Sequence, residues 1–194
     1  MGWSWSVALV QAAHEFMLCS GPFGPRQWLV DKKLQQPQPS PNVHMMYVDN
    51  FAALGPDPVA VEQDTASMEA QLRARGLATH DRRPVAQKGD IIGFSFDGLA
   101  GVVKPAVAKY WKIVLATKHV LAHPMITGRE LEKLIGHWMH ICLVRRESLA
   151  IFSAVFQFIT RSYDRRQPLW HSTRRELHLA VSIASLLRAD LRAP

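Results

Sequence analysis

The aspartate Asp49, in the four-residue sequence YVDN at 47–50, is the residue best placed to do chemistry. Apolar runs at 43–46 and 51–54 flank it, which predicts a β-hairpin with Asp49 and Asn50 at its tip. Asp and Asn tolerate the positive φ that such a tip requires, so a purely structural role is open. A carboxylate on a rigid tip is also suited to bind Mg²⁺, which prefers oxygen ligands.

The chain is basic, with 23 Lys and Arg against 16 Asp and Glu and a formal net charge of +7. Much of this charge is in clustered arginines, which favours phosphate contacts over scattered solubilising charge. We therefore expect an acidic partner such as nucleic acid, although a protein that is merely basic is the alternative. The expected phosphate contacts are Arg82, Arg83, Arg145, Arg146, Arg165 and Arg166.

Cysteine usage and hydropathy indicate the compartment. The only two cysteines, Cys19 and Cys142, lie far apart in apolar surroundings, which favours free thiols in a reducing compartment. No run of about 18 apolar residues that could span a bilayer occurs. The N-terminus lacks the basic region of a secretory signal. The sequence therefore predicts an intracellular protein of the cytoplasm or nucleus, neither secreted nor in a membrane.

Local signals predict an α+β chain, with helices packed on an antiparallel sheet in the first half and helices alone in the second. In the first half we expect an apolar helix at 7–19, a proline-rich loop at 35–41, a helix that starts at Asp57 and Pro58 and ends at Gly76, and a short strand at 91–96. In the second half, two capping boxes, Thr127/Glu130 and Thr173/Glu176, each predict the start of a helix.

These segments resemble, in order, the palm motifs and the thumb of retrotransposon-type reverse transcriptases. Residues 1–11 look like motif B, the YVDN sequence looks like motif C, usually Tyr-x-Asp-Asp, residues 72–79 are similar to motif D, and residues 91–97 look like motif E. Residues 106–159 resemble the thumb, most clearly at the sequence GRELEKLIGH. The resemblance implies a partial palm at 1–104, a helical thumb at 105–167, and a connecting helix at 168–194 that leads toward a ribonuclease H region.

The resemblance implies an RNA-directed DNA polymerase whose whole form extends a primer on an RNA or DNA template. Its cofactors would be two Mg²⁺ ions with Asp49 as the catalytic ligand, and its partners a primer–template duplex and deoxynucleoside triphosphates. Gly93 and Phe94 would form the primer grip, and Arg82 and Arg83 would replace the motif D lysine, stabilising charge without donating a proton. The implied substrate- or template-side residues are Gly2, Trp3, Ser6, Gln11, Tyr47 and Asn50.

Two departures from the family pattern bear on activity. Motif A, with its own catalytic aspartate, would precede motif B, whereas this chain opens within motif B. Asn50 stands where the family usually has a second Asp, and its neutral oxygen is a weaker ligand for a hard dication. We therefore expect the chain alone to be inactive and an Asp-bearing motif A to be encoded upstream. The alternatives are a non-catalytic basic domain that binds nucleic acid, and a helical protein-interaction module in which YVDN is coincidental.

Overall fold

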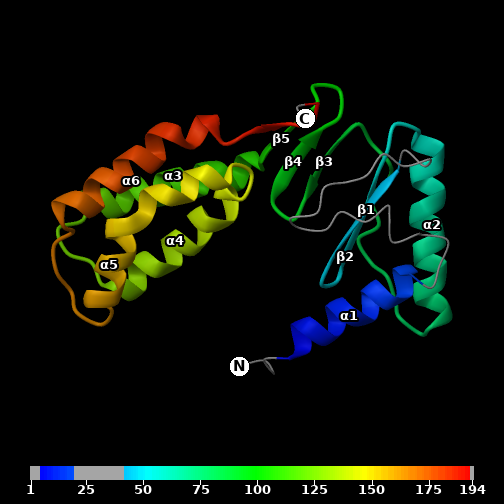
Figure 1. Ribbon diagram of the computed structural model, residues 1–194, viewed down its shortest axis with the longest axis horizontal. Helices are drawn as coiled ribbons and strands as arrows, with labels where there is room; N and C mark the ends of the chain where they lie inside the picture. Colours follow the sequence, from blue (N-terminus) through cyan, green and yellow to red (C-terminus); the bar gives the residue numbers. More distant parts are fainter. Residues whose placement is uncertain (1–4, 20–41, 193–194) are drawn as a thin grey trace. The chain divides into compact units, whose positions relative to one another are not determined.

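The computed structural model describes residues 5–19 and 42–192, and these form two compact units, Met1–Ala86 and Gln87–Pro194 (Figure 1). Within the described residues the chain has six α-helices and two antiparallel sheets, which confirms the α+β class. No helix in the described part of the chain is long and apolar enough to cross a bilayer. The predicted proline-rich loop at 35–41 lies outside the described residues.

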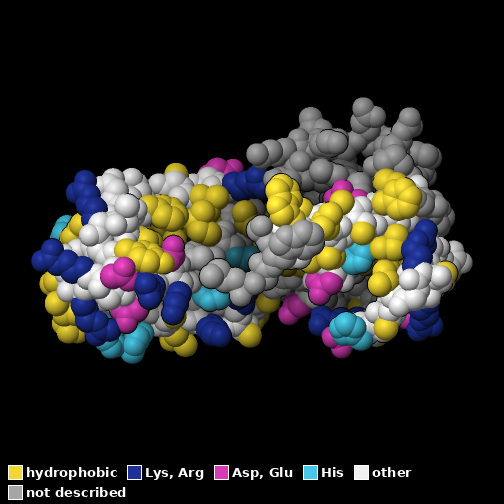
Figure 2. Space-filling view, turned by 90° about the horizontal axis from the view of Figure 1, so that it is seen from below, with side chains coloured by type: hydrophobic (Ala, Val, Ile, Leu, Met, Phe, Trp, Pro, Cys, Tyr) yellow, Lys and Arg dark blue, Asp and Glu magenta, His cyan; other side chains and the backbone are white. Residues whose placement is uncertain are grey.

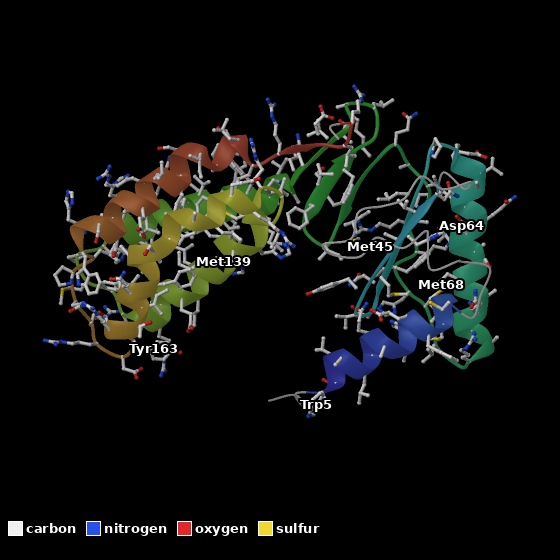
Figure 3. All side chains as sticks on the ribbon, in the orientation of Figure 1. Trp5, Met45, Asp64, Met68, Met139 and Tyr163 are labelled. Carbon is white, nitrogen blue, oxygen red and sulfur yellow. The ribbon has the colours of Figure 1, made fainter. Side chains whose placement is uncertain are left out.

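The first unit is a hairpin covered by two helices. It consists of α1 (Ser6–Cys19), β1 (Val43–Tyr47), β2 (Asn50–Leu54) and α2 (Pro58–Ala74). Met46 of the hairpin and Met68 of α2 are the buried centre of a small core, which Phe51 and Leu72 extend. Met68 points from α2 toward the hairpin (Figure 3) and is 1% exposed, so its burial contributes about 1.5–3 kcal/mol.

The ends of α2 follow the sequence prediction. The Asp57 side chain accepts a hydrogen bond of 2.9 Å from the Val59 amide, and Pro58 occupies the first helical turn. At the other end Gly76 has a φ of 77°, and the Leu77 amide donates to the carbonyl of Leu72. This is a Schellman ending, so local chemistry alone determined the bounds of this helix.

The second unit combines a small sheet with a helical bundle. The sheet has the order β3 (Lys88–Ile91), β4 (Phe94–Asp97), β5 (Val102–Pro105) and β6 (Ala189–Asp190), antiparallel throughout. The single strand predicted at 91–96 is therefore wrong, because Ile92 and Gly93 form the turn between β3 and β4. The helical elements are α3 (Val107–Ala122), α4 (Gly128–Cys142), η2 (Arg146–Phe152), α5 (Ser153–Arg161), α6 (His171–Ile183) and η3 (Ala184–Leu186).

The bundle encloses a large apolar core whose largest side chains are Trp138, Phe152 and Phe158, each fully buried. The Trp138 indole donates to the Thr117 hydroxyl over 2.8 Å, which satisfies both polar groups inside the core. A Cβ added to Gly128 would lie 2.4 Å from the Ile159 carbonyl oxygen, so the start of α4 packs directly on α5 only because this residue is glycine.

One of the two predicted capping boxes forms. Thr127 and Glu130 cap α4 reciprocally, as predicted. The prediction for Thr173 and Glu176 is wrong, because α6 begins earlier, at His171, and has no side-chain cap. Glu176 instead accepts hydrogen bonds from the amides of Ala154 (2.9 Å) and Val155 (2.8 Å) and caps the start of α5.

The boundary between the compact units lies at Ala86/Gln87, upstream of the domain boundary expected at 104/105. The strands β3, β4 and β5 belong with the helices that follow, because β5 pairs with β6 near the end of the chain and the β3–β4 turn contacts α4. Residues 168–194, expected as a connecting helix, contribute Leu177, Ala180 and Ala184 to the same core.

Candidate functional site

The tip of the first hairpin lies one residue earlier than predicted. Tyr47 pairs with Asn50, so Val48 and Asp49 form the two-residue turn and Asn50 begins β2. Val48 has a φ of 54° and Asp49 does not have a positive φ, which is the pattern of a type II′ turn. A β-branched residue at positive φ is an outlier that surrounding contacts must hold in place.

Those contacts come from α1. The Val48 amide donates to Oε1 of Gln11 over 2.7 Å, and Nε2 of Gln11 donates to the Met46 carbonyl over 3.2 Å. The Nδ1 atom of His14 donates to the Val48 carbonyl. Both backbone polar groups of the strained residue are thus bonded by side chains of one helix. Sequence analysis assigned Gln11 and the hairpin to separate motifs, and the fold brings them together.

The Asp49 carboxylate is exposed at the turn, and its Oδ1 accepts a 2.9 Å hydrogen bond from the Asn50 side-chain amide. Within the described residues, no group of three or more His, Cys, Asp or Glu side chains could hold a metal ion. Mg²⁺ prefers six oxygens in octahedral order. Asp49 therefore fits as one ligand of such an ion, and the others would have to come from beyond its described neighbours.

Of the other residues predicted on the substrate or template side, some lie in α1 and β1 and others lie outside the described residues. Ser6 is the first residue of α1 and is half-buried, while Tyr47 is 56% exposed at the end of β1. Gly2 and Trp3 lie outside the described residues. Hydrophobic side chains lie exposed over α1 and the residue before it (Figure 2), namely Trp5, Val7, Leu9, Val10 and Phe16.

A buried polar cluster anchors the base of the hairpin to α2, and sequence analysis missed it. Asp64 of α2 points toward the hairpin (Figure 3), and its Oδ2 accepts hydrogen bonds from His44 Nε2 (3.0 Å) and Asn42 Nδ2 (2.7 Å). His44 is 1% exposed and stacks on Phe51 with 5.9 Å between ring centroids. A His in an apolar strand and an Asp in a helix gave no local signal of this pairing.

The turn between β3 and β4 carries the predicted primer-grip residues. Ile92 and Gly93 have φ values of 50° and 81°, the pattern of a type I′ turn. Nε2 of His140 in α4 donates to the Ile92 carbonyl over 3.0 Å, and the His140 ring stacks on Phe94 with 4.9 Å between centroids. A Cβ added at Gly93 would lie 2.8 Å from Nζ of Lys109, so glycine lets α3 approach the turn.

Burial shifts the pKa of two side chains beside this turn, His140 and Lys109. Burial lowers the pKa of His140, and the ammonium of Lys109 lowers it further. Burial likewise lowers the pKa of Lys109. The neutral imidazole has one N–H to donate, and the Ile92 carbonyl receives it. Sequence analysis found neither Lys109 nor His140 as a site residue, because only the fold places them beside Gly93.

The six predicted phosphate contacts have different surroundings. Arg82 forms ion pairs with Glu62 and Glu69, and Arg166 pairs with Glu130 over 2.7 Å, so a phosphate would compete with these carboxylates. The pKa of Glu69 is lowered by a hydrogen bond from Thr79 and by the neighbouring arginines. All six side chains are exposed, the other four being Arg83, Arg145, Arg146 and Arg165.

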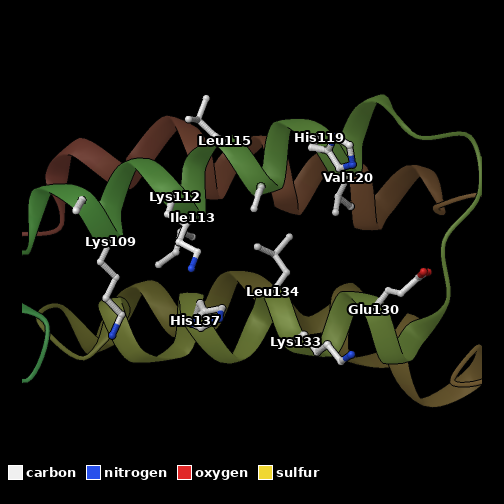
Figure 4. A pocket seen from close by; sticks show the side chains of 12 residues that line it. Lys109, Lys112, Ile113, Leu115, His119, Val120, Glu130, Lys133, Leu134 and His137 are labelled. Carbon is white, nitrogen blue, oxygen red and sulfur yellow. The ribbon is translucent and has the colours of Figure 1, made fainter.

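A groove of about 900 Å³ runs between α3 and α4 of the second unit (Figure 4). Ile113, Val120 and Leu134 form an apolar floor, and lysines from both helices line it. The full lining is Ala108, Lys109, Lys112, Ile113, Leu115, Ala116, His119, Val120, Glu130, Lys133, Leu134 and His137. Sequence analysis emphasised arginine clusters and missed these lysines, which come from separate helices.

Neither a protein-family model, nor a curated protein, nor a solved structure matches this chain.

Proposed function

We propose that this chain is part of a reverse transcriptase whose whole form extends a primer on an RNA or DNA template. One observation supports this more than any other, the hydrogen bonding of Val48 by Gln11 and His14 beside an exposed carboxylate. Strained residues cluster where a functional group must be held in one position. Here the strained residue, Val48, lies directly before Asp49, and side chains of α1 hold its backbone in place.

In this proposal Asp49 holds one of two Mg²⁺ ions. When bound, the ions activate the primer 3′-hydroxyl and stabilise the charge on the transferring phosphate and its pyrophosphate leaving group. Gln11 and His14 fix the turn and so the position of the carboxylate. The Asn50 amide donates to Asp49 and orients it. Gly93 and Phe94, held by α3 and α4, would contact the primer end, and deoxynucleoside triphosphates would be the substrates.

The proposal requires at least one further carboxylate. A site for two Mg²⁺ ions would need carboxylates from more than one position, and in the described region the tip of the hairpin offers Asp49 alone. Asn50 adds no charge. We therefore expect the 194-residue chain to lack polymerase activity by itself and to gain it when a segment that carries a second aspartate is joined to it.

Primer extension tests this proposal. It would be measured for this chain, for the longer chain read in frame from the same gene, and for Asp49→Asn in the longer chain. We expect extension from the longer chain only, and its loss in Asp49→Asn. Asp81→Asn is the matched control, because Asp81 is exposed in the same unit and Asn tolerates its φ of 57°. Activity that survives Asp49→Asn would refute the proposal.

A second candidate is a non-catalytic domain that binds nucleic acid. The groove between α3 and α4 favours it, because three lysines border an apolar floor in a unit that does not contain Asp49. Binding of nucleic acid that is unchanged by Asp49→Asn, together with no extension by the longer chain, would select this candidate.

A further inference from the structure

The groove between α3 and α4 is bordered by lysines that form no ion pair with the described residues. Lys109 and Lys112 are one turn apart on α3, and Lys133 lies on α4 (Figure 4). In the described part of the chain none of the three forms an ion pair. The one acid in the lining, Glu130, is already engaged by Arg166 and by the Thr127 amide. The groove is therefore cationic.

Lys109 indicates that an anion belongs at one end of the groove. The backbone of Gly93 and the His140 ring lie close to its Nζ, since a Cβ added at Gly93 would be 2.8 Å from Nζ and 3.4 Å from Nε2 of His140. A half-buried ammonium without a carboxylate partner is costly. A bound phosphate would offset that cost.

The floor distinguishes an unpaired strand from a duplex. Ile113 and Leu134 are buried at the base of the groove. The accessible apolar surface comes from the exposed Ala108, Leu115 and Ala116 and the half-buried Val120, so the lining offers apolar contact. A duplex shields its base faces and presents phosphates, whereas an unpaired strand also offers base faces that pack on apolar and aromatic side chains. The exposed ring of His137 is available for stacking, whereas the His119 ring already contacts His123 with 4.0 Å between centroids.

We propose that this groove binds one unpaired strand of nucleic acid, with phosphates on Lys109, Lys112 and Lys133 and bases on the apolar floor. The inference rests on the proposed function in that it takes nucleic acid to be the partner. The strand would run from the Gly93 turn toward Glu130, along the length of both helices. The charges on the two helices and the floor between them would thus act on the same ligand.

Binding of a labelled oligonucleotide of about 12 nucleotides, single-stranded or in a duplex of the same sequence, tests the inference over a range of salt concentrations. The groove variant is Lys112→Gln/Lys133→Gln. The matched control is Lys104→Gln/Lys118→Gln, which removes the same charge from exposed positions of the same unit outside the groove lining. All four lysines are exposed, so both variants should fold, which circular dichroism would check.

The intact chain should bind the single strand more tightly than the duplex. In the groove variant the slope of log K against log salt should fall by about 1.4, since each phosphate contact on a single strand contributes about 0.7. The control should keep the slope of the intact chain. In addition, nuclear magnetic resonance should show that the single strand raises the pKa of Lys109, because a nearby phosphate favours the charged ammonium.

Each other outcome overturns the inference. Duplex binding that equals single-strand binding, with a slope unchanged in the groove variant, would remove the groove site but leave the proposed function standing. Binding of neither form would refute both. If the groove variant and the control variant lost the same amount of binding, the nucleic acid would bind through charge spread over the surface and not through the groove. Binding of an acidic amphipathic helix, lost in the groove variant while oligonucleotide binding persists, would assign the groove to a protein partner instead.

Discussion

The β1–β2 turn and the β3–β4 turn hold a strained residue in different ways. Each places a β-branched residue at positive φ, Val48 in the first unit and Ile92 in the second. The first turn is held mainly by hydrogen bonds from Gln11 and His14, beside a small core. The second is held by a glycine, by the His140 ring, which stacks on Phe94 and donates to the Ile92 carbonyl, and by a helix that belongs to a large core. The first turn therefore depends mainly on hydrogen bonds, whereas the second depends on packing as well.

The largest effect should come from the core beneath the second turn. Trp138 lies in α4, two residues before His140, and is fully buried. Trp138→Ala leaves a cavity and removes the hydrogen bond that the Thr117 hydroxyl accepts, so it should reduce the free energy of unfolding of the second unit by about 3–5 kcal/mol. Urea denaturation measures this. The control Trp111→Ala, at a position 53% exposed, should cost less than about 1 kcal/mol. Equal costs for the two would contradict the role of the core.

The first turn should respond to the loss of hydrogen bonds. Gln11→Ala removes two bonds to the hairpin backbone and leaves the Val48 amide without its partner. We expect the free energy of unfolding of the first unit to fall by about 1–3 kcal/mol in urea denaturation. Gln63→Ala, an exposed position on α2, should change it by less than about 0.5 kcal/mol. A cost no greater than that of the control would show that the hydrogen bonds do not stabilise the turn.

A glycine at the strained position should weaken the need for Gln11. Gly adopts positive φ without a steric penalty, so Val48→Gly should make Gln11→Ala less costly by about 1 kcal/mol. The four proteins of this double-mutant cycle would be compared by urea denaturation. Strict additivity would mean that the hydrogen bonds and the strain at Val48 are independent.

The smallest effect should be a pH dependence at the second turn. The folded pKa of His140 lies below its unfolded value of about 6.5, so the unfolded chain binds more protons as the pH falls. The stabilisation by neutral His140 is thus complete above pH 6.5 and is lost as the pH falls through the folded pKa. His140→Gln keeps a hydrogen-bond donor without this titration. The stability difference between the intact chain and His140→Gln should shrink from pH 7.5 to pH 5. His178→Gln, at an exposed position of the same unit, is the control for the substitution itself.

The sequence predicted the features that depend only on residues close together in the chain. Asp57, Pro58 and Gly76 bound α2, and Thr127 with Glu130 opens α4, because each signal acts within one or two turns. The same kind of signal failed where tertiary contacts competed. Glu176 follows Thr173 at capping-box spacing, yet α5 lies close enough to take its carboxylate.

The candidate site was predictable only in part. The sequence placed Asp49 in the first turn correctly but paired it with Asn50 instead of Val48, because the pairing of Tyr47 with Asn50 sets the register. The residues that hold the turns come from distant parts of the chain. Lys109 and His140 meet Gly93 only through the packing of α3 and α4, and neither position carries a local pattern.

The central claim is that α1 positions the Asp49 carboxylate for catalysis. The most direct measurement is the rate of primer extension by the longer chain that the proposed function requires, carrying Gln11→Ala, with Gln63→Ala as its control. A displacement of a catalytic group by about 1 Å can cost about a hundredfold in rate. We predict a loss of that order in Gln11→Ala and an unchanged rate in the control. An unchanged rate in Gln11→Ala, with the chain still folded, would contradict the account.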